Sequence, residues 1–269
     1  MNAIAISVNE ENWPAAMESV TSSGSVCGLV APVNLLMNSA DFHSAVANGG
    51  VNLPHAIRPM GGNAERYLYE SGGGKRNRIL GHWVRVLSPL GAMGVGSVAV
   101  DLGLDRIRQA DAESAIGLRI EILKHILSCL ESPLTLTVRV RCPPDFPGSR
   151  SWERAAQIVH GVMDAGCRLQ LDVFPGEIEL IEEWQEFERA FHLYAAVLNL
   201  HIDPSAEESL AESGALDLCA GLRRRGFRGL TYFTLVGACQ TAKNYRTLCR
   251  DIANSFFADA DHSFSQPIV

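Results

Sequence analysis

Two arginines, an aspartate and a histidine lie near the ends of three successive apolar segments of the chain. Arg139 and Arg141 end the first segment, Asp172 ends the second, and His201 ends the third, where Asn199 comes two residues earlier. Guanidinium groups bind phosphate or carboxylate through paired hydrogen bonds, while carboxylate and imidazole groups transfer protons. These residue types predict a site that binds a small anion and moves a proton on it.

The elements that must position these residues follow a regular order along the chain. From about residue 97 onward, short β-branched segments alternate with longer helical periods, and the first third contains three further strand-like segments. Strands are expected at 3–8, 26–31, 51–57, 96–101, 134–142, 168–174, 197–203 and 230–236. This order predicts an α/β protein, a (β/α)8 TIM barrel, whose sites gather at the carboxyl ends of the strands. A doubly wound sheet of six strands is the alternative.

Polar and apolar residues alternate within three adjacent predicted strands. Leu, Ile and Val occupy every second position, and the positions between them are polar. Because successive side chains of a strand point to opposite faces, the polar set is expected inside the barrel and the apolar set against the outer helices. The polar set is Thr135, Thr137, Arg139, Arg141, Arg168, Gln170, Asp172, Asn199, His201 and Asp203.

Charged groups inside a barrel need partners, because an unpaired buried charge loses its solvation. We therefore expect Arg139, Arg141, Asp172 and His201 to interact. One interpretation is a structural ion-pair network that fills the interior. The other is a functional site in which the arginines hold an anion, while Asp172 and His201 are placed for proton transfer.

Several further residues are candidates for the same end of the barrel. His55 and Asp101 are expected to reach it from the third and fourth strands, and Glu177 lies just beyond a strand end. Glu177 is a candidate acid or base there, although the start of a helix is the favoured explanation for it. The glycines and basic residues of 71–78 predict a mobile connection rather than an anion-binding loop.

The composition limits the class of protein. The chain has 269 residues, 47% of them hydrophobic and 20% charged, and a net charge of −7. This balance predicts one globular domain over 1–269, with 257–269 as a C-terminal tail, and gives no general attraction to nucleic acid. Seven cysteines without a CxxC pair, no basic leader and no long apolar run favour a cytoplasmic protein without membrane contact. The oligomeric state stays open, a homo-oligomer included.

Four short segments carry a resemblance to a known family. They are Leu90-Gly91-Ala92, Leu169-Gln170-Leu171-Asp172, Leu200-His201-Ile202-Asp203 and Gly226-Phe227-Arg228-Gly229. In this order and spacing, residues 76 to 256 resemble the xylose isomerase-like TIM barrels, a superfamily that includes sugar phosphate isomerases and epimerases and family 2 AP endonucleases.

The resemblance implies a divalent metal held by Glu, Asp, His and a final Glu at the ends of successive strands. Asp172 and His201 match two of these ligands, but the first Glu falls on Arg139 or Arg141 and no acid ends the last strand. The second His that usually follows the Asp motif is replaced by Phe174 or Pro175. We therefore expect no metal cofactor. We expect an arginine to supply the positive charge that the metal provides in the family.

The resemblance leads to two functional hypotheses. The first is a sugar phosphate isomerase/epimerase-like protein that binds a small anionic sugar or sugar acid, with Asp172 and His201 as catalytic residues. The second is a catalytically inactive barrel that acts as a ligand-binding or protein-interaction subunit. A nucleic-acid role is a distant third. The residues expected to contact the ligand are Arg139, Arg141, Asp203, Asn199, His55, Asp101 and Glu177.

Overall fold

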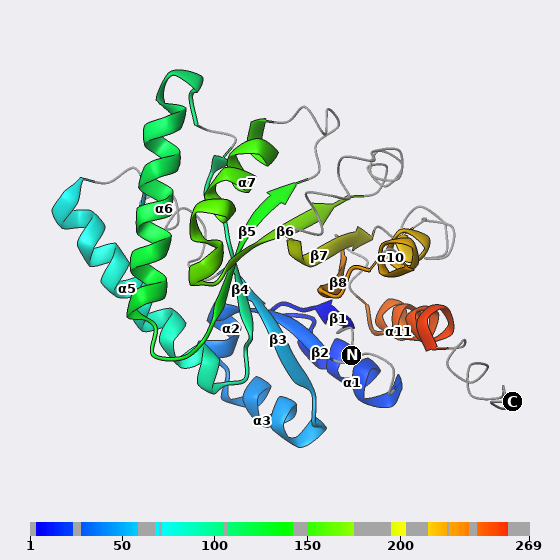
Figure 1. Cartoon of the computed structure of the whole chain (residues 1–269). Coiled ribbons are helices and arrows are strands. Elements are labelled where there is room, and N and C mark those ends of the chain that lie inside the picture. The colour runs from blue at the N-terminus through cyan, green and yellow to red at the C-terminus, as the bar shows by residue number, and fades with distance from the viewer. Residues whose placement is uncertain are drawn as a thin grey trace, which may run out of the picture.

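Eight parallel strands form a closed barrel in the computed structural model of the chain (Figure 1). Each strand pairs with the next, and β1 also pairs with β8, so the sheet has no free edge. The structure describes residues 4–23, 28–58, 68–69, 72–104, 107–141, 150–174, 195–202, 215–224, 226–236 and 241–257. The predicted TIM barrel is confirmed, and the six-strand alternative is excluded.

The strands have nearly the predicted bounds. They are β1 (Ile4–Ser7), β2 (Gly28–Pro32), β3 (Asn52–Ile57), β4 (Ser97–Val100), β5 (Thr135–Arg141), β6 (Cys167–Val173), β7 (Ala195–Ile202) and β8 (Leu230–Leu235). The apolar positions of β5 and β6, such as Leu136, Val138 and Leu171, belong to the main hydrophobic core beneath the helices. The positions between them face the barrel interior, which confirms the predicted alternation.

Amphipathic helices surround the barrel (Figure 1). They are α1 (Trp13–Ser23), α2 (Val33–Asn38), α3 (Ala40–Gly49), α5 (Gly73–Ala92), α6 (Ala112–Cys129), α7 (Arg150–Val162), α10 (Ala215–Arg224) and α11 (Ala242–Phe257), with short 3-10 turns at Gln109–Asp111 and Met163–Ala165. Helix α5 buries Leu80, Trp83, Leu87 and Leu90, whose spacing of three and four residues places them on one face. Neighbouring helices also pack on one another, α1 on α11 and α6 on α7.

Two glycines shape the turn that leads into β8. Gly226 has a φ of 103°, a conformation that costs glycine little. A side chain at Gly229 would bring its Cβ within 2.3 Å of the carbonyl oxygen of Ala196, so only hydrogen fits beside β7. Gly229 is therefore required by close backbone packing, whereas Gly226 is favoured by its positive φ.

One predicted connection forms part of a helix instead. Residues 73–78 make up the first turns of α5, so the basic residues there extend a helix rather than a mobile loop. Of the predicted tail at 257–269, Phe257 ends α11, and the rest lies outside the described residues. Within the described part of the chain, no helix is long and apolar enough to cross a membrane.

Candidate functional site

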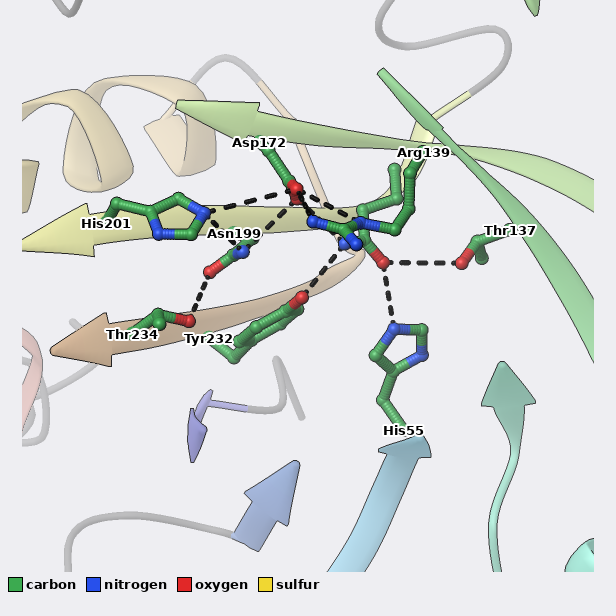
Figure 2. Close-up of polar contacts among 9 residues, drawn as sticks. His55, Thr137, Arg139, Asp172, Asn199, His201, Tyr232 and Thr234 are labelled. Carbon is green, nitrogen blue, oxygen red and sulfur yellow. Dashed lines mark hydrogen bonds and ion pairs between the residues drawn. The ribbon is translucent and has the colours of Figure 1, made fainter. Parts of the chain in front are cut away.

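Polar side chains from four adjacent strands meet inside the barrel near its carboxyl end (Figure 2). The strand register explains the meeting, because Arg141 of β5 lies opposite Asp172 of β6, which in turn lies opposite Asn199 of β7. His201 lies opposite Thr234 of β8. Inward-facing positions at the same height of neighbouring strands thus bring side chains from distant parts of the sequence together.

The ion pair between Arg139 and Asp172 is the centre of this group. Nε of Arg139 donates to Oδ2 of Asp172 at 3.1 Å, and Nη2 donates to the same oxygen. The Asp172 side chain is 5% exposed, and that of Arg139 is 31% exposed. Burial opposes ionisation of Asp172, but the charge of Arg139 and the hydrogen bonds from Arg139 and Gln170 outweigh it and hold its pKa well below the ordinary value. Asp172 is therefore a fixed carboxylate.

Asn199 connects this ion pair to His201. The Asp172 carboxylate, which only accepts, fixes the orientation of the Asn199 amide, and Oδ1 of Asn199 accepts the hydroxyl hydrogen of Thr234 at 2.8 Å. Its Nδ2 then lies 3.2 Å from Oδ1 of Asp172 and 2.9 Å from Nε2 of His201. Since an amide nitrogen only donates, Nε2 of the neutral imidazole is an acceptor and its hydrogen is on Nδ1. The same Nε2 lies 4.0 Å from the Asp172 carboxylate.

Below this group, Gln170 forms the centre of a second, deeper layer. Its Nε2 donates to Oδ1 of Asp172 at 2.8 Å and to the hydroxyl of Tyr232 at 2.9 Å. Its Oε1 must therefore accept, and it receives the Nε2 hydrogen of His55 at 2.8 Å and a longer bond from Thr137 at 3.4 Å. Each of these side chains has a hydrogen-bonded partner, as a buried polar layer requires.

His55 is neutral in this layer. Its side chain is fully buried, and its Nδ1 accepts from the hydroxyl of Ser97 at 2.7 Å. Burial lowers the pKa of His55 to about 4, because an imidazolium cation would lose its hydration there. Burial likewise raises the pKa of Tyr232 well above its ordinary value. Neither group changes its charge near neutral pH.

A cavity of about 90 Å³ lies above the ion pair, at the carboxyl ends of the strands. The functional groups on its wall include Arg139, Asn199, His201, Tyr232 and Thr234 from the barrel interior. Arg58, which directly follows β3, lines the same cavity, and so do residues at the end of β1. No carboxylate is among its described lining residues. The cavity therefore suits a small ligand with negative charge.

The structure brings Arg139, Asp172, Asn199 and His201 together as the sequence predicts. His55 belongs to the deeper layer and contacts Gln170, because its place on β3 is below the mouth. His55 does not line the cavity, so its contact with a ligand stays a prediction.

Four other predicted site residues have different outcomes. Arg141 does not line the cavity, and its guanidinium carbon lies 4.2 Å from the ring centroid of Phe174. Asp101 is exposed after β4, where its Oδ1 accepts from the amide of Gly103 at 2.9 Å. Its charge still reaches Arg139 and contributes to the raised pKa of that guanidinium. Asp203 and Glu177 lie outside the described residues.

The sequence did not identify three residues of the site. Tyr232 and Thr234 occupy alternate positions of β8, so the alternation that was applied to the preceding strands would have found them. Arg58 carries a weaker signal, since a basic residue directly after a strand is common on any protein surface. Its importance depends on backbone geometry that the sequence does not reveal.

Comparisons with known proteins support the fold. No family model matches the sequence, and no curated protein matches it. Among solved structures, the D-psicose 3-epimerase of Clostridium cellulolyticum H10 is 14% identical over 96% of this chain and 98% of that protein, with a TM-score of 0.62. A putative sugar phosphate isomerase/epimerase of Anabaena variabilis is 12% identical over 94% of this chain and 98% of that one, with a TM-score of 0.64.

A family 2 AP endonuclease of Brucella melitensis is also similar, with 15% identity over 86% of this chain and 91% of that protein and a TM-score of 0.59. These proteins share the barrel with the present chain. Identities this low show a common fold, so function must be argued from the site. The chain thus has the (β/α)8 TIM barrel fold, which it shares with these proteins.

Proposed function

We propose that the barrel mouth binds a small anionic sugar or sugar acid and transfers a proton next to its carbonyl group, as an isomerase or epimerase does. The observation that carries this proposal is that His201 and Arg139 both line the cavity in fixed orientations. Asn199 is hydrogen-bonded to His201, and Asp172 is hydrogen-bonded to Arg139. Removing such a proton requires a base and a positive group that stabilises the resulting enediolate. His201 and Arg139 are candidates for these two tasks.

The proposed step begins with the neutral imidazole of His201. A substrate that displaces the amide hydrogen of Asn199 from Nε2 would present its C–H bond to that lone pair. The C–H bond breaks and its proton goes to Nε2. The electron pair forms a carbon–carbon double bond, the carbonyl oxygen takes up the negative charge, and the substrate becomes an enediolate. The new imidazolium would lie 4.0 Å from the Asp172 carboxylate, which stabilises it. The proton then returns from Nε2 to the former carbonyl carbon, while the hydroxyl proton of the enediolate passes from the neighbouring oxygen to the former carbonyl oxygen, which completes an aldose–ketose isomerisation.

Arg139 supports the same step from β5. Its bonds to Asp172 use Nε and Nη2, and Nη1 has no partner among the described residues. Nη1 is therefore available to donate to the carbonyl oxygen as negative charge develops on it. Asp172 itself is a poor base, because its pKa lies far below neutral pH. Its role in the proposal is to hold Arg139 and to balance the charge of His201.

The resemblance to metal-dependent barrels raises the question whether a divalent metal fits here. Oδ2 of Asp172 accepts from Arg139, and Oδ1 accepts from Gln170 and Asn199, so both oxygens are already in use. The described residues contain no group of three His, Cys, Asp or Glu that could hold a metal ion. A guanidinium beside a metal would also repel it. The described donor set does not fit a metal, and we propose that none is required.

Metal analysis tests this part of the proposal. Protein purified without chelator should contain no stoichiometric Mn, Zn, Mg or Co. Stoichiometric metal that is lost in both Asp172→Asn and His201→Asn would contradict it.

A non-catalytic ligand-binding or interaction subunit is the second candidate. Its support is that both carboxylate oxygens of Asp172 already accept hydrogen bonds and that its pKa is low, so Asp172 cannot serve as a second base. A nucleic-acid role is not proposed, because the net charge of −7 offers no general attraction to phosphodiester backbones.

Binding and exchange measurements separate the two candidates. Phosphorylated and acidic sugars are first screened by thermal shift, and each binder is then incubated in deuterated water. Incorporation of deuterium next to the carbonyl supports proton transfer, and binding without exchange supports the second candidate. Arg139→Met should abolish binding, whereas Arg85→Met, a change of an exposed arginine on the outer helix α5, should not. Unchanged affinity in Arg139→Met would end the proposal.

A further inference from the structure

Arg58 has an unusual backbone conformation at the carboxyl end of β3. Its φ is 52°, and it is the only non-glycine residue with a positive φ in the described part of the chain. Positive φ is uncommon for residues with long side chains, whereas glycine and asparagine adopt it more readily. Such outliers occur most often where a side chain has a functional task.

The charge of Arg58 is directed toward the barrel mouth. Arg58 lines the cavity together with Arg139 and Tyr232. Burial raises the pKa of Tyr232 and the Asp172 carboxylate adds to this effect, whereas the positive charges of Arg139 and Arg58 oppose it. Arg58 therefore acts electrostatically on a residue inside the barrel, although its own side chain is exposed.

The other two arginines of the site are less able to hold a ligand's charge. Arg139 is neutralised by the Asp172 carboxylate, with which it forms a buried ion pair. Arg141 contacts the ring of Phe174 and does not line the cavity. Arg58 forms no ion pair with a carboxylate among the described residues, and within that part of the chain it is the cavity-wall arginine whose charge no bound carboxylate offsets.

The barrel topology sets Arg58 opposite His201. Strands β3 and β7 are four places apart in a closed barrel of eight, which puts them on opposite sides of the mouth. A ligand that lies across the mouth would have one end at Arg58 and the other at the imidazole. Both residues line one cavity, so a single small molecule can contact both.

We propose that Arg58 binds the terminal oxyanion of the ligand, a phosphate or a carboxylate, and thereby selects anionic sugars over neutral ones. This inference rests on the proposed function, because it assumes that the reacting carbonyl lies at His201 and Arg139. The inference specifies how the ligand is oriented across the barrel mouth. The charged end of the sugar is held on β3, and the carbon that exchanges its proton is held near β7.

Titration calorimetry with a matched set of probes tests the proposal. Glucose 6-phosphate, glucuronate and glucose share the same carbonyl carbon and ring and differ at C6, which carries a phosphate, a carboxylate or a hydroxyl group. Wild-type protein should bind one or both anions more tightly than glucose, and the preferred anion identifies the oxyanion. Arg58→Gln should weaken binding of that anion about tenfold to a hundredfold and leave glucose unchanged, since a charge-assisted hydrogen bond is lost. The control Arg85→Gln should bind all three probes like wild type.

A second variant excludes a folding defect. Arg58→Gly should lose the same anion affinity while its melting temperature is equal to or above that of wild type, because glycine tolerates a positive φ. If Arg58→Gln binds the anion as wild type does while Arg139→Met does not, the role of Arg58 is refuted and the proposed function stands. If Arg58→Gln and Arg58→Gly weaken binding of glucose as much as binding of the anion, Arg58 does not select between anionic and neutral sugars. If wild-type protein binds neither anion, the proposed function and the role of Arg58 both fall.

Discussion

The imidazole of His201 is stacked on the phenyl ring of Phe174, with ring centroids 3.9 Å apart and planes inclined by 6°. Phe174 directly follows β6 and is also contacted by the guanidinium of Arg141. Asn199 holds one nitrogen of His201, while Phe174 holds the plane of its ring. These two contacts together fix the direction of the imidazole toward the cavity.

Replacing Phe174 with leucine should release the His201 ring without unfolding the barrel. Leucine fills much of the same volume, so we expect a loss of about 1 kcal/mol or less in the free energy of unfolding. The ring-current shift of the His201 resonances in the NMR spectrum should disappear in Phe174→Leu and persist in Phe174→Tyr. In an active protein, Phe174→Leu should lower kcat more than it raises KM. His201 resonances that do not move in Phe174→Leu would contradict the positioning role.

The ion pair of Arg139 and Asp172 should show strong energetic coupling. Arg139→Met leaves a buried carboxylate without its cation and should cost about 3 kcal/mol of unfolding free energy. Asp172→Asn keeps a hydrogen-bonding side chain beside Gln170 and Asn199, and should cost less. The double variant should be more stable than the sum of the single losses predicts, by about 1 kcal/mol or more. Urea denaturation of the four proteins at pH 7 measures the coupling, and additive losses would show that the pair is energetically unimportant.

The stability of the barrel should fall as the pH drops from 6.5 toward 4, because of His55. The ordinary pKa of histidine is 6.5, whereas the pKa of His55 in the fold is about 4. Between these values the unfolded chain binds a proton that the folded chain does not, so acid favours unfolding. The full difference corresponds to roughly 3 kcal/mol and is reached near pH 4.

Replacing His55 with glutamine should remove this part of the pH dependence. Urea denaturation of wild type and His55→Gln at several pH values between 7 and 4 should give a steeper decline for wild type. His82→Gln, which changes an exposed histidine of α5, serves as the control and should decline like wild type. Parallel curves for wild type and His55→Gln would mean that His55 is not held neutral by burial.

Much of the site could be predicted from the sequence because β5, β6 and β7 alternate cleanly. Apolar residues at every second position of these strands fixed the inner face, and with it Arg139, Asp172, Asn199 and His201. The depth of a residue in the barrel could not be predicted, since it depends on the stagger between strands. His55 therefore lies one layer deeper than expected. Arg58 escaped notice because a positive φ at a strand end leaves no pattern in the sequence.

Two substitutions in the buried layer around Gln170 should lower the free energy of unfolding by different amounts. Tyr232→Phe removes an acceptor from Nε2 of Gln170, but that nitrogen still donates to Asp172. The expected loss of unfolding free energy is about 1 kcal/mol, the net value of one hydrogen bond.

Gln170→Leu should be much more harmful than Tyr232→Phe. It removes the acceptor of the His55 Nε2 hydrogen and a donor to the Asp172 carboxylate, and it leaves both groups buried. Each unsatisfied buried group costs about 1–3 kcal/mol, so the loss should be at least twice that of Tyr232→Phe. Urea denaturation of both variants gives the order. If Gln170→Leu is no less stable than Tyr232→Phe, the amide is not the link that joins His55 to the Asp172 carboxylate.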